Sequence, residues 1–136
     1  MIYLGIDPGL KGAATIVTDS GNVVVQEWTT VLDVYDWLAT FTDDHTLAVI
    51  EKIGWGAKVS KNAGEWIGML TALRIPFKEI TPKKWQKHFG TFSKEKTRRK
   101  NELKQIAQQL HPDIKWTHAT AAAFLIATYC REVAWK

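Results

Sequence analysis

Cysteine is almost absent from this chain of 136 residues, and so are long apolar runs, repeats and flexible linkers. The single Cys130 excludes an internal disulfide and any zinc site built from several cysteines. No apolar run approaches the roughly 20 residues that a membrane-spanning helix needs. No repeat, low-complexity tract or flexible linker divides the sequence, so we expect a single domain over residues 1–136.

The start of the sequence does not have the pattern of a targeting segment. A strand-like segment follows Met1 directly, so we expect no signal peptide. Cys130 lies among apolar residues and is predicted to be an ordinary core thiol. Together these features favour a cytoplasmic protein without membrane contacts.

Positive charge is concentrated in one stretch. Residues 82–104 contain nine Lys or Arg against two Glu, although the whole chain carries only +4. Such a stretch indicates a polyanionic partner such as nucleic acid, and a solvated, lysine-rich helix surface is the alternative. The candidate phosphate contacts are Lys83, Lys84, Lys87, Lys94, Lys96, Arg98, Arg99 and Lys100.

The hydrophobic pattern predicts an α/β domain. Residues 2–7, 12–18 and 23–28 are short runs rich in β-formers and joined by turns, which is typical of three antiparallel strands. The nearly continuous apolar run 46–51 and the short run 77–80 predict two further strands. Five helices complete the pattern, and the whole implies a mixed sheet covered on both faces. They are expected after Thr30, from Ser60 to Leu73, after Thr81-Pro82, from Ser93 to His111, and from Thr117 to Trp135.

Two carboxylates end two of these strands. Asp7 closes the first strand and Glu51 closes the strand after the first helix. If the two strands are neighbours, both acids lie at one edge of the sheet and repel each other unless a hard divalent cation lies between them. Gly5, Gly9 and Gly12 would let another backbone or a phosphate approach Asp7 closely. The alternative is a turn aspartate beside an ordinary strand-end glutamate.

The motifs form an ordered series along almost the whole chain. They are "GIDPG", "GAATIV", "AVIEK", "GEWIGML", "ITPKKWQKHFG", "SKEKTRRKNELKQIAQQLHP" and "ATAAAFLIATY". This series resembles the RuvC family of Holliday junction resolvases, above all its short phage-type members. The resemblance implies an RNase H-like fold and a homodimeric endonuclease of recombination and repair, which cuts four-way DNA junctions with two Mg²⁺ or Mn²⁺ ions per site. An actin-like ATPase also opens with a glycine-flanked aspartate, but would need a second phosphate-binding loop and a much longer chain.

The resemblance assigns roles to particular residues. Asp7 matches the carboxylate that bridges the two ions, and Glu51 matches a ligand of one of them. The family's last carboxylate falls at Ala122, or alternatively at Ala121. His118, three and four residues earlier on the same helix face, is a candidate metal ligand or water-positioning group; the alternative is an exposed first-turn histidine.

The run of three alanines therefore departs from the family's pattern at the position of its last metal-binding carboxylate. Neutral His118 does not replace a carboxylate, because it brings no charge to balance divalent cations. One explanation is natural loss, which leaves a protein that binds junctions without cutting them. The intact Asp7 and Glu51 favour the other explanation, a deliberate replacement of aspartate at Ala122.

Further DNA contacts are expected beside the two carboxylates. Lys11 lies near Asp7 in the chain, and Lys52 and Lys58 follow the other carboxylate, so these lysines could hold the cut strand. Trp55, between two glycines, is a candidate wedge between unstacked bases. Its alternative role is packing.

Gly64 and Gly68 stand four residues apart and predict a close helix approach. The resemblance places this helix in a dimer whose twofold symmetry matches that of the junction. Packing within the domain is the alternative.

Overall fold

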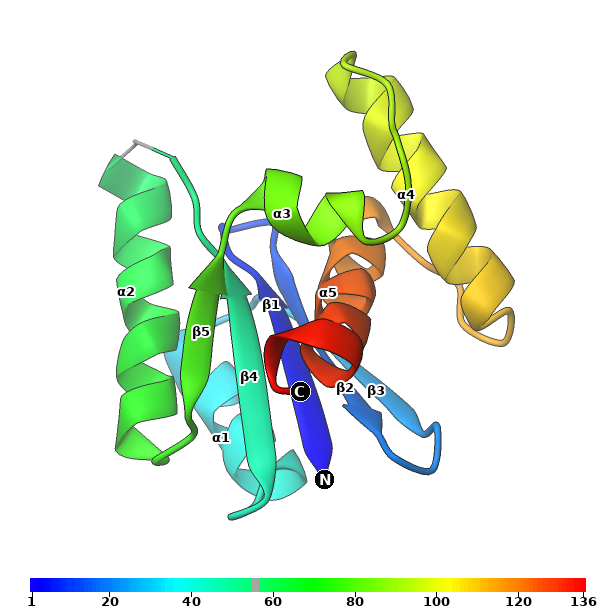
Figure 1. Cartoon of the computed structure of the whole chain (residues 1–136). Coiled ribbons are helices and arrows are strands. Elements are labelled where there is room, and N and C mark those ends of the chain that lie inside the picture. Colours follow the sequence, from blue (N-terminus) through cyan, green and yellow to red (C-terminus); the bar gives the residue numbers. More distant parts are fainter. Residues whose placement is uncertain (55–56) are drawn as a thin grey trace.

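A five-stranded mixed sheet forms the centre of the protein, in the order β3-β2-β1-β4-β5 (Figure 1). The computed structural model describes residues 1–54 and 57–136. Neighbouring strands among the first three are antiparallel, and the last two run parallel to the first. This confirms the predicted fold class and strand directions. The strands are β1 (Ile2–Asp7), β2 (Ala13–Thr18), β3 (Val23–Glu27), β4 (Thr46–Glu51) and β5 (Phe77–Ile80).

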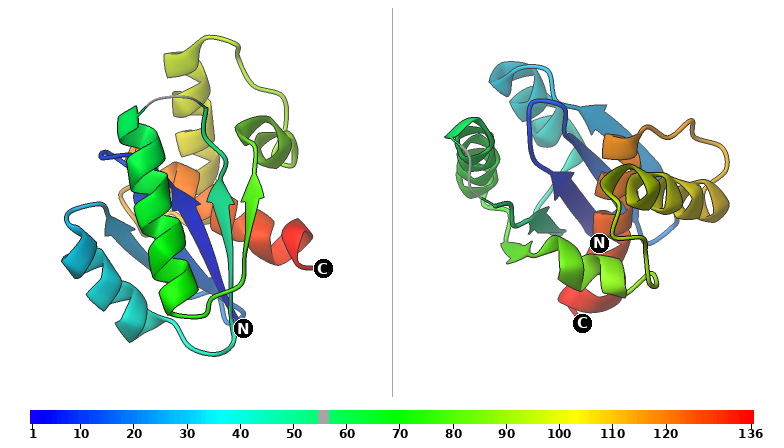
Figure 2. Two further views of the ribbon diagram at one scale, coloured as in Figure 1. Left: turned by 90° about the vertical axis from the view of Figure 1, so that its left-hand side faces the viewer. Right: turned by 90° about the horizontal axis from the view of Figure 1, so that it is seen from above.

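Helices cover both faces of the sheet, as predicted. They are α1 (Val31–Phe41), α2 (Ala57–Ala72), α3 (Pro82–Lys87), α4 (Lys96–Leu110), α5 (His118–Tyr129) and a final π-helical turn, η1 (Cys130–Ala134). Figure 2 shows α1 and α2 on one side of the sheet and the later helices on the other. Each side has its own apolar core, around Trp66 and Leu70 on the first side and around Trp116 and Leu125 on the second. Cys130 is fully buried in the second core. Within the described residues, no helix is both long and apolar enough to cross a bilayer.

Two predicted helix starts differ from those observed. Helix α2 begins before Ser60, and α4 begins at Lys96 with Glu95 as its N-cap in place of Ser93. The Glu95 carboxylate accepts hydrogen bonds from the backbone N–H groups of Thr97 and Arg98, at 3.0 and 2.6 Å, and these bonds lower the pKa of Glu95. A carboxylate is favoured there because it also interacts with the positive end of the helix dipole.

Gly5 allows α5 to cross β1 at very short range. A Cβ atom at Gly5 would lie 2.2 Å from the backbone nitrogen of Ala127 and 2.3 Å from the carbonyl oxygen of Ala123. Only a residue without a side chain fits this crossing. The predicted close backbone approach near Asp7 is therefore an approach by the C-terminal helix, and it brings the start of α5 to the strand ends.

Candidate active site

Asp7 and Glu51 lie side by side at the carboxyl ends of neighbouring parallel strands. The pairing of β1 with β4 runs in register up to Ile6 and Ile50, and the two acids are the next residues on each strand. Both line a cavity of about 410 Å³, here called the carboxylate cavity. Its walls come from both strand ends and from α3, α4 and α5, which lie far apart in sequence and converge at this edge of the sheet (Figure 1). The lining residues are Asp7, Lys11, Glu51, Pro82, Trp85, Gln86, Lys96, Arg99, Lys100, Leu103, His118, Ala119 and Ala122.

The electrostatics of the pair disfavour two negative charges. Burial, and then the charge of Glu51, raises the pKa of Asp7 to about 8, and Lys100 acts in the opposite direction. Burial also raises the pKa of Glu51, opposed by its hydrogen bond from Trp85. Two buried acids with raised pKa values are typical of sites that bind a cation or move a proton.

Trp85 orients Glu51. This indole is completely buried on α3, and its Nε1–H donates a 2.7 Å hydrogen bond to Glu51 Oε2. Sequence reasoning assigned no polar role to Trp85, so this contact was missed. The available signal was a general one: a buried indole N–H needs a hydrogen-bond acceptor, and the carboxylate at the end of β4 is one.

Asn62 holds the loop that follows Asp7. Its side chain is 1% exposed, and its Oδ1 accepts a 2.8 Å hydrogen bond from the backbone N–H of Gly9. Sequence reasoning missed this residue as well. Asn62 lies four residues before the buried Trp66, so a polar side chain on the apolar face of the helix was the available signal.

The start of α5 distinguishes the two alanine positions. Ala122 is half-buried and lines the carboxylate cavity, together with Ala119 and His118. Ala121 is 1% exposed and belongs to the apolar core. A carboxylate at position 122 would therefore face Asp7 and Glu51, whereas one at position 121 would be buried among hydrophobic side chains.

His118 lies in the same cavity wall and is tied to α4. Its Nε2 forms a 2.7 Å hydrogen bond with Asn101 Oδ1. In the tautomer with its proton on Nε2, the imidazole donates this bond to the amide oxygen and Nδ1 keeps a lone pair. Asn101 thereby orients the ring of His118, in the way that outer partners orient metal-binding histidines. The sequence did not single out Asn101.

The residues present do not complete a two-ion centre. The two adjacent carboxylates suit a hard divalent cation. Among the described residues, however, no group of three His, Cys, Asp or Glu side chains converges on one point as a metal site. Ala122, where the resemblance places the family's last carboxylate, contributes only a methyl group to the cavity wall, and a methyl group binds no metal ion.

Basic side chains border the carboxylate cavity along one face of α4. Lys96, Arg99 and Lys100 line it at helical spacing, with Leu103 one turn further. Lys11 lines it from the loop after β1.

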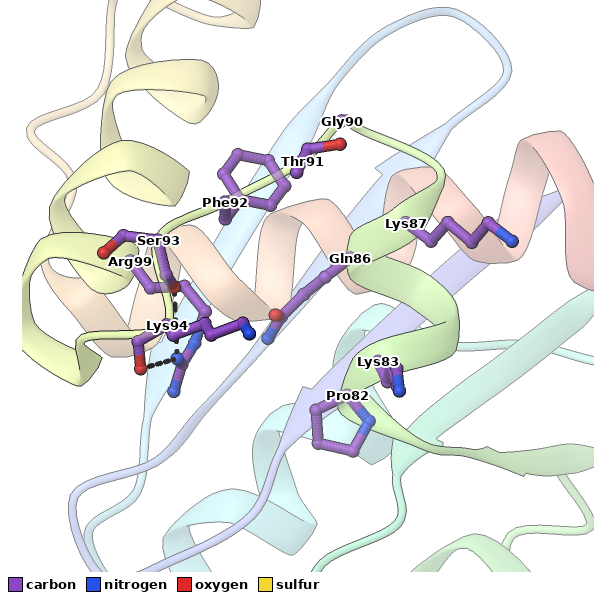
Figure 3. A pocket seen from close by; sticks show the side chains of 10 residues that line it. All are labelled: Pro82, Lys83, Gln86, Lys87, Gly90, Thr91, Phe92, Ser93, Lys94 and Arg99. Carbon is purple, nitrogen blue, oxygen red and sulfur yellow. Dashed lines mark hydrogen bonds between the residues drawn. The ribbon is translucent and has the colours of Figure 1, made fainter.

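A second cavity of about 680 Å³ lies between α3 and residues 90–94, here called the α3–α4 cavity (Figure 3). It is lined by Lys83, Lys87, Lys94 and Arg99 among others, and it shares Pro82, Gln86 and Arg99 with the carboxylate cavity.

The other predicted DNA contacts lie away from these cavities or outside the described part of the chain. Lys52, Lys84 and Arg98 are exposed and line neither cavity. Trp55 lies outside the residues that the structure describes, as does the side chain of Lys58. Their predicted roles stay predictions.

The chain is similar in structure to resolvases over nearly its whole length. No family model and no curated protein matches the sequence. Thermus thermophilus RuvC superimposes with a TM-score of 0.69 at 16% identity, over 96% of each chain. T. thermophilus RuvC in complex with a Holliday junction substrate gives 0.66 at 16% identity, over 98% of this chain and 96% of that one. Fowlpox virus resolvase in complex with its Holliday junction DNA gives 0.62 at 16% identity, over 96% and 99%. The chain therefore has the RNase H-like fold of the RuvC-type Holliday junction resolvases, which confirms the predicted resemblance at the level of the fold.

Proposed function

We propose that this protein binds four-way DNA junctions and is built as a junction-resolving endonuclease whose metal centre lacks one carboxylate. The observation that carries the proposal is the carboxylate cavity, where Asp7, Glu51, His118 and the methyl group of Ala122 meet under a rim of lysines and arginines. The likeness to resolvases whose structures were solved in complex with Holliday junction DNA supports the substrate class.

The missing group in this proposal is an aspartate at position 122. With it, Asp7, Glu51 and the new carboxylate would supply three acidic ligands for two Mg²⁺ or Mn²⁺ ions, with His118 beside them. Without it, the chain binds junctions and does not cut them. The same observations fit a protein that lost cleavage naturally and serves as a branched-DNA-binding protein.

DNA binding in this proposal depends on phosphate contacts. Lys96, Arg99 and Lys100 border the two acids, so a phosphodiester drawn to these cations comes next to the carboxylates. Phosphate contacts carry no sequence information, and selectivity for a junction then comes from the spacing of two such sites in a homodimer.

The test compares the parent chain with Ala122→Asp on a labelled four-way junction, with Mg²⁺ or Mn²⁺. We expect both to bind the junction and only Ala122→Asp to make paired, symmetric nicks. Calorimetric titration with Mn²⁺ should show tighter binding to Ala122→Asp, because a third carboxylate is added. Ala119→Asp is the matched control, since it places the same charge one helical turn earlier on the same wall.

Three outcomes would contradict the proposal. If neither chain binds the junction in preference to duplex DNA, the substrate is wrong. If both bind and Ala122→Asp neither cuts nor binds metal more tightly, the protein is a binding module and the metal argument fails. If Ala119→Asp restores cleavage equally well, the position of the missing ligand is wrong.

A further inference from the structure

The α3–α4 cavity carries a charge that the protein itself leaves uncompensated. Lys83, Lys87, Lys94 and Arg99 line it, and none of the acidic residues in the described part of the chain does. Among the described residues, none of these four side chains forms an ion pair within 4.0 Å. A cavity lined by unpaired cations attracts an anion.

Arg99 is held in position for such an anion. Its Nη1 donates hydrogen bonds to the carbonyl oxygens of Ser93 and Lys94, at 3.4 and 3.1 Å. These bonds anchor the guanidinium to the loop before α4, as Figure 3 shows. They use two of its five N–H donors, which leaves the other three for the oxygens of a phosphate.

Phe92 gives the same cavity an aromatic wall. The ring is half-buried, packs against the second core, and lines the cavity. Gly90 beside it has φ of +141°, and a methyl group there would touch Phe92 Cζ at 3.8 Å. Gly90 therefore leaves the end of the ring uncovered. Figure 3 shows Gln86 reaching from α3 toward the side where Phe92 and Lys94 lie.

We propose that the α3–α4 cavity takes one unpaired nucleotide of the DNA strand that leaves the carboxylate cavity, with its base against Phe92 and its phosphates on Lys94 and Arg99. The two cavities share Arg99 and Gln86, so one strand can pass from the first to the second. A volume of about 680 Å³ lies within the roughly 300–1,000 Å³ of pockets that enclose small organic ligands, which is enough for a nucleotide. The inference rests on the proposed function, because it takes branched DNA as the ligand.

The experiment measures binding to four-way junctions with and without one unpaired nucleotide at the branch, placed as 2-aminopurine. We expect Phe92→Leu, which keeps an apolar side chain, to weaken binding of the junction with the unpaired base roughly five-fold or more. The change in 2-aminopurine fluorescence on binding should be lost with it. Phe92→Tyr should retain both, since it keeps the aromatic face. Phe89→Leu is the matched control, because this nearby ring packs in the same core and does not line the cavity.

A second variant keeps the test valid if Phe92→Leu unfolds. Lys94→Ala, at an exposed position, should lower the slope of log affinity against log salt by about 0.7, while the exposed Lys115→Ala leaves it unchanged. If Phe92→Leu and Lys94→Ala both behave as their controls while the parent binds junctions, this inference is overturned and the proposed function stands. If the parent does not prefer junctions to duplex DNA, the proposed function itself fails.

Discussion

At the residue scale, the chemistry of the site depends on which groups balance the negative charge of Asp7. The groups that face it are Glu51, which repels it, and Lys100, which attracts it. Glu51 in turn receives the indole N–H of Trp85. Without a bound cation, the protein therefore stabilises the protonated form of this buried acid, and its stability depends on pH.

We predict that the metal-free protein becomes less stable as the pH rises from about 4 to 8. The pKa of Asp7 is about 8 in the folded chain against 3.8 as its ordinary value, so the folded state binds this proton more tightly. That contribution is complete below the unfolded pKa and is lost as the pH rises through the folded pKa. Asp7→Asn should flatten the dependence and, at pH 8, raise the free energy of unfolding by roughly 1–3 kcal/mol.

Urea unfolding in the presence of a chelator at pH 5, 6.5 and 8 measures this effect. Asp19→Asn is the control, because the amino terminus lowers the pKa of the exposed Asp19 and its contribution has the opposite sign. An unchanged pH slope in Asp7→Asn would show that Asp7 is not the buried titrating acid.

At the element scale, the crossing of α5 over β1 brings the site together. Ala122 comes from a helix and Asp7 from a strand more than a hundred residues earlier, and they meet because Gly5 lets the two backbones touch. The capping box of Thr117 and Thr120 starts the helix beside the cavity. The position of the helix start therefore depends on one glycine and one cap.

We predict that Gly5→Ala lowers the free energy of unfolding by about 3 kcal/mol, since its methyl group would overlap the backbone of α5. The helix would have to move away from the sheet, and junction binding should weaken with it. Gly54→Ala is a suitable control, because a Cβ there meets no described atom within 4 Å. Denaturant midpoints of the two variants give the comparison, and equal midpoints would refute the close crossing.

At the scale of the whole molecule, the face of α2 that carries Gly64 and Gly68 bears on assembly. Both glycines are exposed, and a Cβ at either would meet none of the described atoms within 4 Å. Packing within the described part of the domain thus does not explain them, contrary to one of the two alternatives that the sequence left open. We keep the homodimer as a proposal, with this face as its candidate interface.

We predict that Gly64→Arg combined with Gly68→Arg converts a dimer into a monomer without lowering the melting temperature. The long charged side chains would block a close helix approach between two copies, and within one copy their Cβ atoms meet none of the described atoms within 4 Å. Ala39→Arg is the control, because it introduces the same side chain on the exposed side of a different helix, α1. Sedimentation analysis reads out the mass, and a parent chain that is already monomeric would rule out the interface.

Most of the fold was predictable because it depends on local patterns. Strand and helix periods, the caps at Thr30, Thr81 and Thr117, and Pro82 at a helix start are short-range signals, and all are observed. The cap at Glu95 was missed because Ser93 carries a similar short-range signal two residues earlier. A single capping hydrogen bond decides whether a helix begins at one residue or at the next, so the sequence predicts such boundaries only to within one or two residues.

By itself, the sequence determined the order of the elements, the two strand-end carboxylates and the concentration of positive charge before and within α4. These follow from composition and spacing along the chain. The tertiary structure alone decided that position 122 faces Asp7 while position 121 faces the core, that Trp85 and Asn101 hold Glu51 and His118, and that two cavities meet at Arg99. The physical reason is that these relations join residues of different elements, and only packing brings such residues within a few ångströms of each other.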